Sequence, residues 1–241
     1  HPQPLAEGIW GCHLWASSGH ELFVRSVIPA GALVGTALRS KALRRFLIAA
    51  PSLHEMGIFY HLLTLLRARD KEEKPEHEVI IIDMPATGHA LALTGLPRIL
   101  LRLIPGGPIV RLLKEGQSYL NDPQQTSAWI VTLPEPLPVT EALELLAGMK
   151  ETDMTVGGMI LNRLPQDPFT TGERAVVETL LQERPTYGGL TYRRIVASQA
   201  ARQRLAAAAQ RPILTLTDRR EQGGDLIDAL AEEVRNAMEA R

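Results

Sequence analysis

Several features that mark particular classes of protein are absent from this chain of 241 residues. It has a single cysteine, Cys12, so no disulfide bond can form within it. Because no stretch resembles a signal peptide either, the sequence predicts a cytoplasmic protein. The 26 Lys and Arg residues balance 27 Asp and Glu residues, and the net charge of −1 argues against a general attraction to nucleic acid. We expect no transmembrane helix, since the longest apolar stretches are interrupted by Arg98, Arg102 and Arg111.

A glycine-rich loop that could hold nucleotide phosphates is also absent. The chain contains no G-x-x-x-x-G-K-[ST] motif and no related glycine loop that carries a lysine. The Pro-Gly-Gly-Pro sequence at 105–108 has no lysine in place, and its prolines lack the N–H groups that a phosphate cradle needs. The glycine pair at 223–224 follows no strand in a suitable position. A dehydrogenase is disfavoured as well, because no G-x-G-x-x-G sequence follows a predicted strand.

What the chain does contain is an alternation of short apolar runs with longer amphipathic ones, which is typical of an α/β protein with a mostly parallel sheet. The apolar runs predict strands near 78–83, 128–133, 156–161 and 212–216. The amphipathic stretches predict helices near 32–48, 53–69, 109–120, 139–151, 171–183, 191–209 and 223–239. The charge-rich residues 67–78 are expected to form an exposed connection. Length and composition together favour one large domain over residues 1–241.

Polar residues follow each of the four predicted strands. They are Asp83, then Pro134 with Glu135, then Asn162 with Arg163, and finally Thr217 with Asp218. Parallel strands joined by right-handed crossovers bring their C-terminal ends to one edge of the sheet, where α/β proteins bind ligands. This convergence favours a nucleotide site. The other interpretation stays open, since Asn, Asp and Pro are common wherever strands end.

Three segments of the chain resemble a known family. Residues 78–93, EVIIIDMPATGHALAL, are similar to the switch II segment of the ArsA/guided-entry family of P-loop ATPases. In that family an Asp after a hydrophobic strand is followed by Ala-Pro-Thr-Gly-His, and here only the Pro-Ala pair at 85–86 stands in the reverse order. TLPEPLPVTEA at 132–142 resembles the family's strand-to-helix passage, and ILNRLP at 160–165 resembles its strand ending in an adenine-contacting Asn. The resemblance extends from about residue 45 to the C-terminus.

The resemblance implies a P-loop NTPase-like α/β fold, with helices on both faces of the sheet, and ATP and Mg²⁺ as cofactors. Asp83 would hold Mg²⁺ through water, a role that suits the oxygen ligands of a carboxylate. Thr87 and Gly88 would form the mobile part of the switch, and His89 would transmit the nucleotide state. Structural roles also fit these residues, because Asp often caps the turn after a strand and a lone His is often structural.

On the base side, the same resemblance assigns adenine contact to Asn162, whose amide offers a paired donor and acceptor. Arg163 would stack on the base or flank it. Thr217 and Asp218 would belong to the opposite wall of the base pocket.

Relative to the family, the chain lacks the N-terminal strand, the Walker A segment and the switch I Asp that positions the attacking water. Two interpretations are open: the chain is incomplete at its N-terminus, or it is a degenerate member. The first predicts the ATP-binding subunit of a cytoplasmic ATPase, in which hydrolysis drives a conformational switch and needs a phosphate loop from outside this chain. The second predicts a non-catalytic regulatory or scaffold partner. Either form would act as a homodimer, or as a heterodimer with a paralogue that has the phosphate loop.

Residues 90–125 form an apolar, helix-prone segment directly after the switch, broken at 105–108. In tail-anchored-protein targeting members of the family, helices at this place open a groove for a protein client. Packing of these apolar residues against the sheet or between subunits is the favoured interpretation, and a groove is the alternative. The segment contains no Met and no Cys, which disfavours both a plastic client surface and an arsenite site built from several thiolates.

Overall fold

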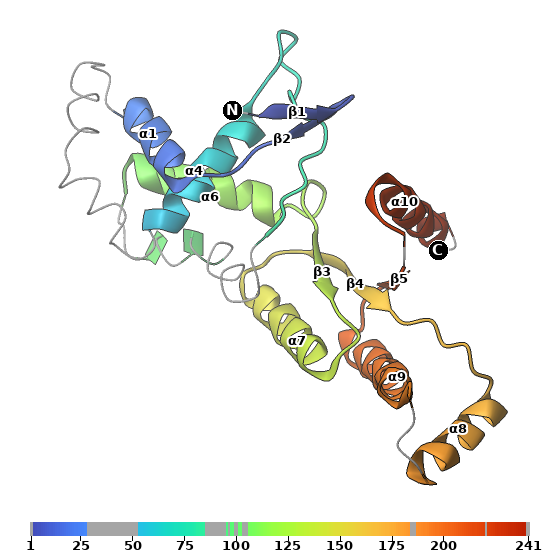
Figure 1. Cartoon of the computed structure of the whole chain (residues 1–241). Coiled ribbons are helices and arrows are strands. Elements are labelled where there is room, and N and C mark those ends of the chain that lie inside the picture. The colour runs from blue at the N-terminus through green and yellow to red at the C-terminus, as the bar shows by residue number, and fades with distance from the viewer. Residues whose placement is uncertain are drawn as a thin grey trace. The chain divides into compact units, whose positions relative to one another are not determined.

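The computed structural model describes residues 2–27, 53–84, 95, 97, 98, 101, 102, 106–183, 187–219 and 221–239. They form two compact units, His1–Gln125 and Thr126–Arg241, each of which is described by itself (Figure 1). The second unit contains a three-stranded parallel sheet flanked by helices, so the α/β class is confirmed. The finer assignment to one P-loop-like domain stays a prediction.

The first unit is mainly helical. Among its described residues, a β-hairpin is followed along the chain by three long helices: β1 (Gln3–Ala6), β2 (Ile9–Gly11), α1 (Ala16–Val27), α4 (Leu53–Arg67) and α6 (Pro108–Asn121). α4 and α6 confirm the helices predicted at 53–69 and 109–120. Neither the hairpin nor α1 was predicted. The strands β1 and β2 are very short and largely exposed, so they carry no alternating pattern. The helix predicted at 32–48 lies outside the described residues.

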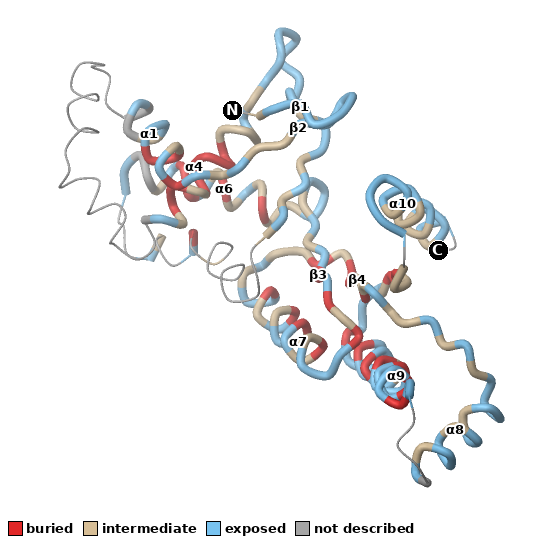
Figure 2. The backbone as a smooth tube through the Cα atoms, viewed as in Figure 1, coloured by how far each residue is buried: buried red, intermediate tan, exposed pale blue. Residues whose placement is uncertain are grey.

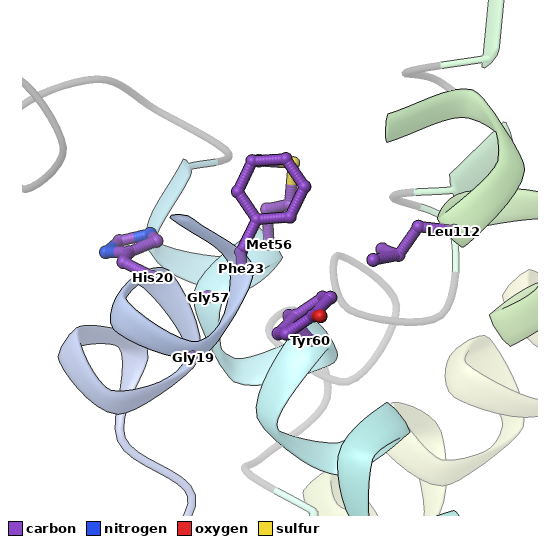
Figure 3. Close-up of a pocket in the computed structure, with 7 residues that line it drawn as sticks. All are labelled: Gly19, His20, Phe23, Met56, Gly57, Tyr60 and Leu112. Atoms are coloured by element: carbon purple, nitrogen blue, oxygen red, sulfur yellow. The ribbon is translucent and has the colours of Figure 1, made fainter. Parts of the chain in front are cut away.

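Helices α1 and α4 approach each other so closely that only glycine fits at their crossing. A Cβ atom on Gly19 would lie 1.7 Å from the carbonyl oxygen of Gly57, well inside van der Waals contact. Beside this contact, Figure 3 shows Phe23, Met56 and Leu112 around a cavity of about 10 Å³. That is roughly the space that one water molecule needs. The crossing is therefore a packing feature and offers no room for a substrate.

The inner face of α4 forms the core of the first unit. Its helical stripe of apolar residues is buried as the spacing predicts: Met56, Phe59, Leu62 and Leu63. α6 packs here through Gly116, where a Cβ would lie 2.1 Å from Cζ of the Phe59 ring. At the edge of this contact, Arg67 Nε donates a hydrogen bond to Glu115 Oε1 at 2.6 Å. Within the predicted apolar segment 90–125, α6 is helical, and so are residues 95, 97, 98, 101 and 102.

The strand predicted at 78–83 is wrong. The structure assigns no strand to these residues, and Val79 and Ile81 are 77% and 91% exposed. The physical reason is that an apolar run becomes a strand only when a neighbouring strand accepts its backbone hydrogen bonds and covers its side chains. The preceding connection is exposed, as predicted, and Asp70 Oδ1 closes its turn by accepting hydrogen bonds from the N–H groups of Glu72 and Lys74.

The second unit is built on the sheet. Strands β3 (Ala128–Thr132), β4 (Val156–Leu164) and β5 (Ile213–Thr217) pair in parallel in the order β3-β4-β5. The helices between and after them are α7 (Pro136–Glu151), α8 (Thr171–Glu183), α9 (Gly189–Ala209) and α10 (Gly223–Glu239). All seven elements lie where the sequence predicts them, within a few residues at each end. The main differences are that β4 runs three residues further than the predicted 156–161 and that α7 begins three residues before the predicted 139.

The two faces of this sheet are covered unequally. On one face, Ile130, Met159 and Leu161 are buried, and α7, which contacts β3, packs against α9. On the other face, Leu214 of β5 is buried where α10 contacts that strand, while Val131 of β3 is 60% exposed. The tube of α10 carries no buried residue (Figure 2). Side chains alternate between the faces of a strand, so this pattern places α10 over β5 and leaves the outer part of that face open.

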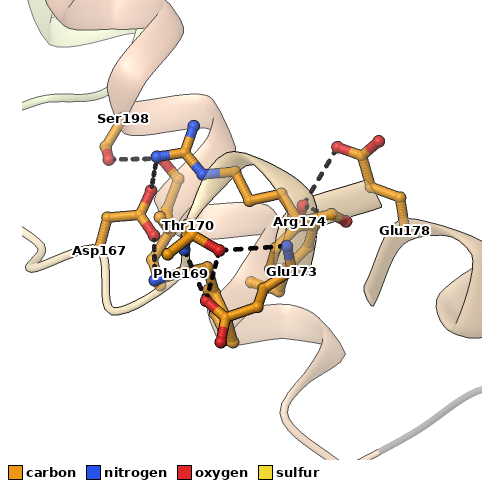
Figure 4. A network of polar contacts seen from close by, with 9 residues as sticks. Asp167, Phe169, Thr170, Glu173, Arg174, Glu178 and Ser198 are labelled. Carbon is orange, nitrogen blue, oxygen red and sulfur yellow. Dashed lines mark hydrogen bonds and ion pairs between the residues drawn. The ribbon is translucent and has the colours of Figure 1, made fainter. Parts of the chain in front are cut away.

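Helix α8 is anchored at its first turn. The N–H and hydroxyl of Thr170 donate to Glu173 Oε2 at 2.7 and 2.8 Å, and Thr170 Oγ1 accepts from the Glu173 N–H at 3.3 Å (Figure 4). This reciprocal pair is a capping box, and its hydrogen bonds lower the pKa of Glu173. Asp167 forms an ion pair with Arg174 of the same turn. The start of α8 is thus fixed by hydrogen bonds and charge.

Candidate functional site

The C-terminal ends of β3, β4 and β5 lie on one edge of the sheet, because the strands are parallel. The pairing aligns Thr132 of β3 with Leu161 of β4, and Leu164 of β4 with Thr217 of β5. Glu135 follows β3 at this edge, where it is exposed and precedes α7, which begins at Pro136. Three of the four predicted polar strand ends therefore share one edge, which is where ligands bind in open α/β sheets.

Asn162 and Arg163 occupy an irregularity in β4. The regular pairing with β5 shifts between Leu161 and Leu164, and Arg163 has a φ of 57°, in the left-handed region that residues other than glycine rarely adopt. A bulge of this kind redirects side chains, and bulges are common next to functional sites. Asn162 is half-buried there, and no described residue forms a hydrogen bond with its carboxamide. Its donor and acceptor groups are available to a ligand.

Asp218, directly after β5, links two arginines. Arg163 Nε donates to Asp218 Oδ1 at 3.2 Å, and Arg194 Nη2 of α9 lies 3.7 Å from Oδ2. The Asp218 N–H also donates to the Leu164 carbonyl at 2.8 Å, which extends the β4–β5 pairing by one residue. Both arginine side chains stay more than half exposed, so each ion pair contributes about 0.2–1 kcal/mol. The cluster is held in place yet open to solvent.

Thr217 and Arg219, the neighbours of Asp218 in the chain, form hydrogen bonds with Glu233 of α10. Glu233 Oε1 accepts hydrogen bonds from the N–H of Thr217 at 3.1 Å and from its hydroxyl at 2.6 Å. The other carboxylate oxygen accepts from Arg219 Nε at 3.3 Å. Glu233 is only 20% exposed in its side chain. One carboxylate from a helix thus fixes both sides of Asp218.

The structure brings together the predicted residues Asn162, Arg163, Thr217 and Asp218 at this edge. It adds three that the sequence reasoning missed: Arg194, Arg219 and Glu233. Arg194 gave no signal, because it is one of several arginines on α9. Glu233 did give one, since it is an acidic residue three positions after Leu230, on the side of α10 that the amphipathic pattern turns inward.

The predicted residues of the phosphate side belong to the first unit. Asp83 is exposed at the end of the extended run that begins at Val79. Thr87, Gly88 and His89 lie outside the described residues. Cys12 is free and half-buried, in agreement with the absence of a disulfide. In the part of the chain that the structure describes, no group of three or more His, Cys, Asp or Glu residues could hold a metal ion.

The edge of the second unit suits the base side of a nucleotide. An adenine edge needs one donor and one acceptor side by side, and the Asn162 carboxamide offers both with no competing partner in the described chain. The arginines beside it can stack on a ring or meet an anionic group. Mg²⁺ is usually bound by one or two carboxylates together with substrate phosphates, and Asp83 offers one exposed carboxylate. None of the described helices combines the length and apolar character that a membrane-spanning segment requires.

Comparison with known proteins gives a partial match to proteins named as ATPases. The chain is 31% identical over 114 residues to ATPase BagA of Mycobacterium tuberculosis strain H37Rv, and this stretch is 47% of the chain and 33% of the relative. A Mycobacterium bovis protein that also carries an ATPase name matches with the same identity and coverage. The chain therefore spans about a third of the length of the curated relatives that it matches. No family model matches the chain.

Proposed function

We propose that this chain is the ATP-binding part of an ArsA-type ATPase and that the second unit binds the base side of the nucleotide. The observation that carries the proposal is the Asn162 carboxamide at the bulge of β4, beside the cluster of Arg163 and Asp218. Its support comes also from the similarity to proteins named as ATPases. The similarity supports an ATPase function, and the assignment to the ArsA type goes beyond it.

In the proposed site, Asn162 reads the adenine edge while Arg163 flanks the base. Thr217 and Asp218 form the opposite wall. Asp83 would hold Mg²⁺ through water, and Thr87, Gly88 and His89 would respond to the γ-phosphate. When bound, the metal ion neutralises phosphate charge, and the role of Asp83 is to fix the ion's water shell. The residues after the switch, 90–125, would carry the change to a dimer partner or to a protein client.

A binding experiment tests the base-side assignment. We expect the chain to bind Mg-ATP more tightly than Mg-GTP, and Asn162→Ala to weaken ATP binding by about 1–2 kcal/mol while reducing this preference. Isothermal titration calorimetry with both nucleotides measures the effect. Asn236→Ala, at an exposed position on α10, is the matched control and should leave both affinities unchanged. Equal losses for ATP and GTP would show that Asn162 does not read the base.

The second candidate is a non-catalytic regulatory or scaffold partner of the same fold. It is favoured by one specific observation, the absence of a lysine-bearing glycine loop from all 241 residues. The two functions differ in what happens when a complete protein or a loop-bearing paralogue is supplied. ATP turnover that depends on Asp83 supports the ATPase. Assembly without any such dependence supports the scaffold.

A further inference from the structure

The carboxylate of Glu233 is unusual among the acidic residues of α10. It faces the sheet, and it accepts hydrogen bonds from Thr217 and Arg219, which flank Asp218 on both sides. Its neighbour Glu232 is exposed. Apart from this contact, α10 packs only loosely on the second unit, since none of its described residues is buried. Leu226, Leu230 and Val234 are half-buried, whereas Ile227 and Met238 are 67% and 60% exposed.

In the contact between Thr217 and Glu233, the backbone N–H of Thr217 is the group that needs a partner. Successive N–H groups of a strand point to opposite sides: the Asp218 N–H donates to Leu164 of β4, so the Thr217 N–H points to the outer edge of β5, where the described sheet has no further strand. A backbone N–H in a partly buried place needs an acceptor. The Glu233 carboxylate supplies that acceptor, and an ionised acceptor makes a stronger hydrogen bond than a neutral one. Without it, Thr217 and Arg219 would lose their attachment to α10, and Asp218 would be held only by its own contacts with β4 and α9.

We propose that Glu233 is a positioning residue for the nucleotide site: it holds the loop Thr217-Asp218-Arg219 in the conformation that places Asp218 against Arg163. This inference rests on the proposed function for its consequence in binding. The contact itself does not depend on that function. The position of α10 on β5 thereby affects Thr217 and Asp218, which form one wall of the proposed base pocket. Displacement of α10 would loosen that wall.

The test compares Glu233→Ala and Glu233→Gln with the matched control Glu232→Gln on the neighbouring exposed residue. In Glu233→Ala, we expect hydrogen exchange at the Thr217 amide to speed up by on the order of tenfold, and Mg-ATP affinity to fall by a similar factor. Glu233→Gln keeps an acceptor oxygen for Thr217 and loses only the charge that meets Arg219, so it should recover most of the protection. Glu232→Gln should match the wild type in both measurements.

The outcomes separate the two proposals. If the wild-type chain binds no ATP, the proposed function fails, and faster exchange at Thr217 in Glu233→Ala still supports the hold on the loop. If the wild type binds ATP and Glu233→Ala binds it equally well with unchanged Thr217 exchange, the positioning role is overturned while the function stands. If Glu233→Ala fails to fold, Glu233→Gln is compared with the wild type instead. Faster exchange at Thr217 in Glu233→Gln with unchanged ATP affinity would also overturn the positioning role.

Discussion

His61 is a buried histidine of the first unit whose ring serves as a hydrogen-bond acceptor. It is 7% exposed, and its Nδ1 atom accepts a hydrogen bond from the Trp15 N–H at 3.2 Å. Burial lowers the pKa of His61 below its ordinary value of 6.5. In the neutral ring Nδ1 carries no proton and can accept this bond. Protonation of Nδ1 would place its N–H opposite the Trp15 N–H, and the hydrogen bond would be lost.

This makes the stability of the first unit depend on pH. Because the folded pKa is lowered, the unfolded chain binds more protons than the folded chain between that pKa and about 6.5, so stability rises with pH through this range. We expect the free energy of unfolding to fall as the pH drops below about 6.5. Urea titrations between about pH 5 and 8 measure it.

His61→Asn should remove this part of the pH dependence, since the Asn oxygen can accept from Trp15 and does not titrate. His54→Asn, at an exposed position on the same helix, is the matched control and should keep the wild-type slope. Identical slopes in wild type and His61→Asn would mean that another group causes the dependence.

At the scale of the element, α8 is held mainly from its first turn to Glu178, whose Oε1 atom accepts a hydrogen bond from the Tyr192 hydroxyl of α9 at 3.1 Å. Its first turn carries the capping box of Thr170 and Glu173, and the Phe169 ring packs on the Tyr192 ring of α9 at 5.6 Å between centroids. Further along, Val176 and Leu180 are 62% and 49% exposed. A hollow of about 630 Å³ lies beside this outer half, between α8 and the start of α9. The contacts that hold α8 are thus concentrated between its first turn and Glu178.

Thr170→Ala should therefore loosen α8 without unfolding the sheet. Loss of an N-cap costs about 0.5–2 kcal/mol, and here it removes the hydroxyl's hydrogen bonds with Glu173. We expect faster amide exchange over residues 171–176 and unchanged exchange in β3, β4 and β5. Thr171→Ala, one residue further on and exposed, is the control and should have little effect. Equal changes in the two variants would show that the cap contributes nothing.

At the scale of the whole molecule, we expect catalysis and nucleotide binding to be separable. Most of the positioning and charge stabilisation in phosphoryl transfer comes from a phosphate loop and a water-positioning residue, and these 241 residues contain no lysine-bearing glycine loop. We expect the chain alone to bind Mg-ATP with turnover at background level, measured by phosphate release. In a complete or complemented protein, Asp83→Asn should reduce turnover far more than ATP affinity. Turnover by the chain alone that disappears in Asp83→Ala would contradict this prediction.

The sequence predicted the second unit well because there the local pattern and the tertiary contacts agree. β3, β4 and β5 are apolar runs bounded by turn residues, and each finds a parallel neighbour. At 78–83 an equally apolar run forms no strand, since Val79 and Ile81 have no cover. The polar strand ends at 162–163 and 217–218 were predicted from the same logic, and the parallel pairing places them at one edge. Ion pairs such as Arg194 with Asp218 could not be predicted, because 24 positions separate the partners and no pattern connects them.

The sequence by itself determined the α/β class, the order of most elements and the type of residue at each strand end, because periodicity and turn chemistry act over a few neighbouring residues. The tertiary structure alone decided which of these residues meet. The bulge at Asn162, whose carboxamide has no hydrogen-bond partner among the described residues, depends on the distances between separate elements, and so do the close crossing at Gly19 and Gly57 and the contact of Glu233 with Thr217. Those distances are set by packing across the whole unit, which no local stretch of sequence encodes.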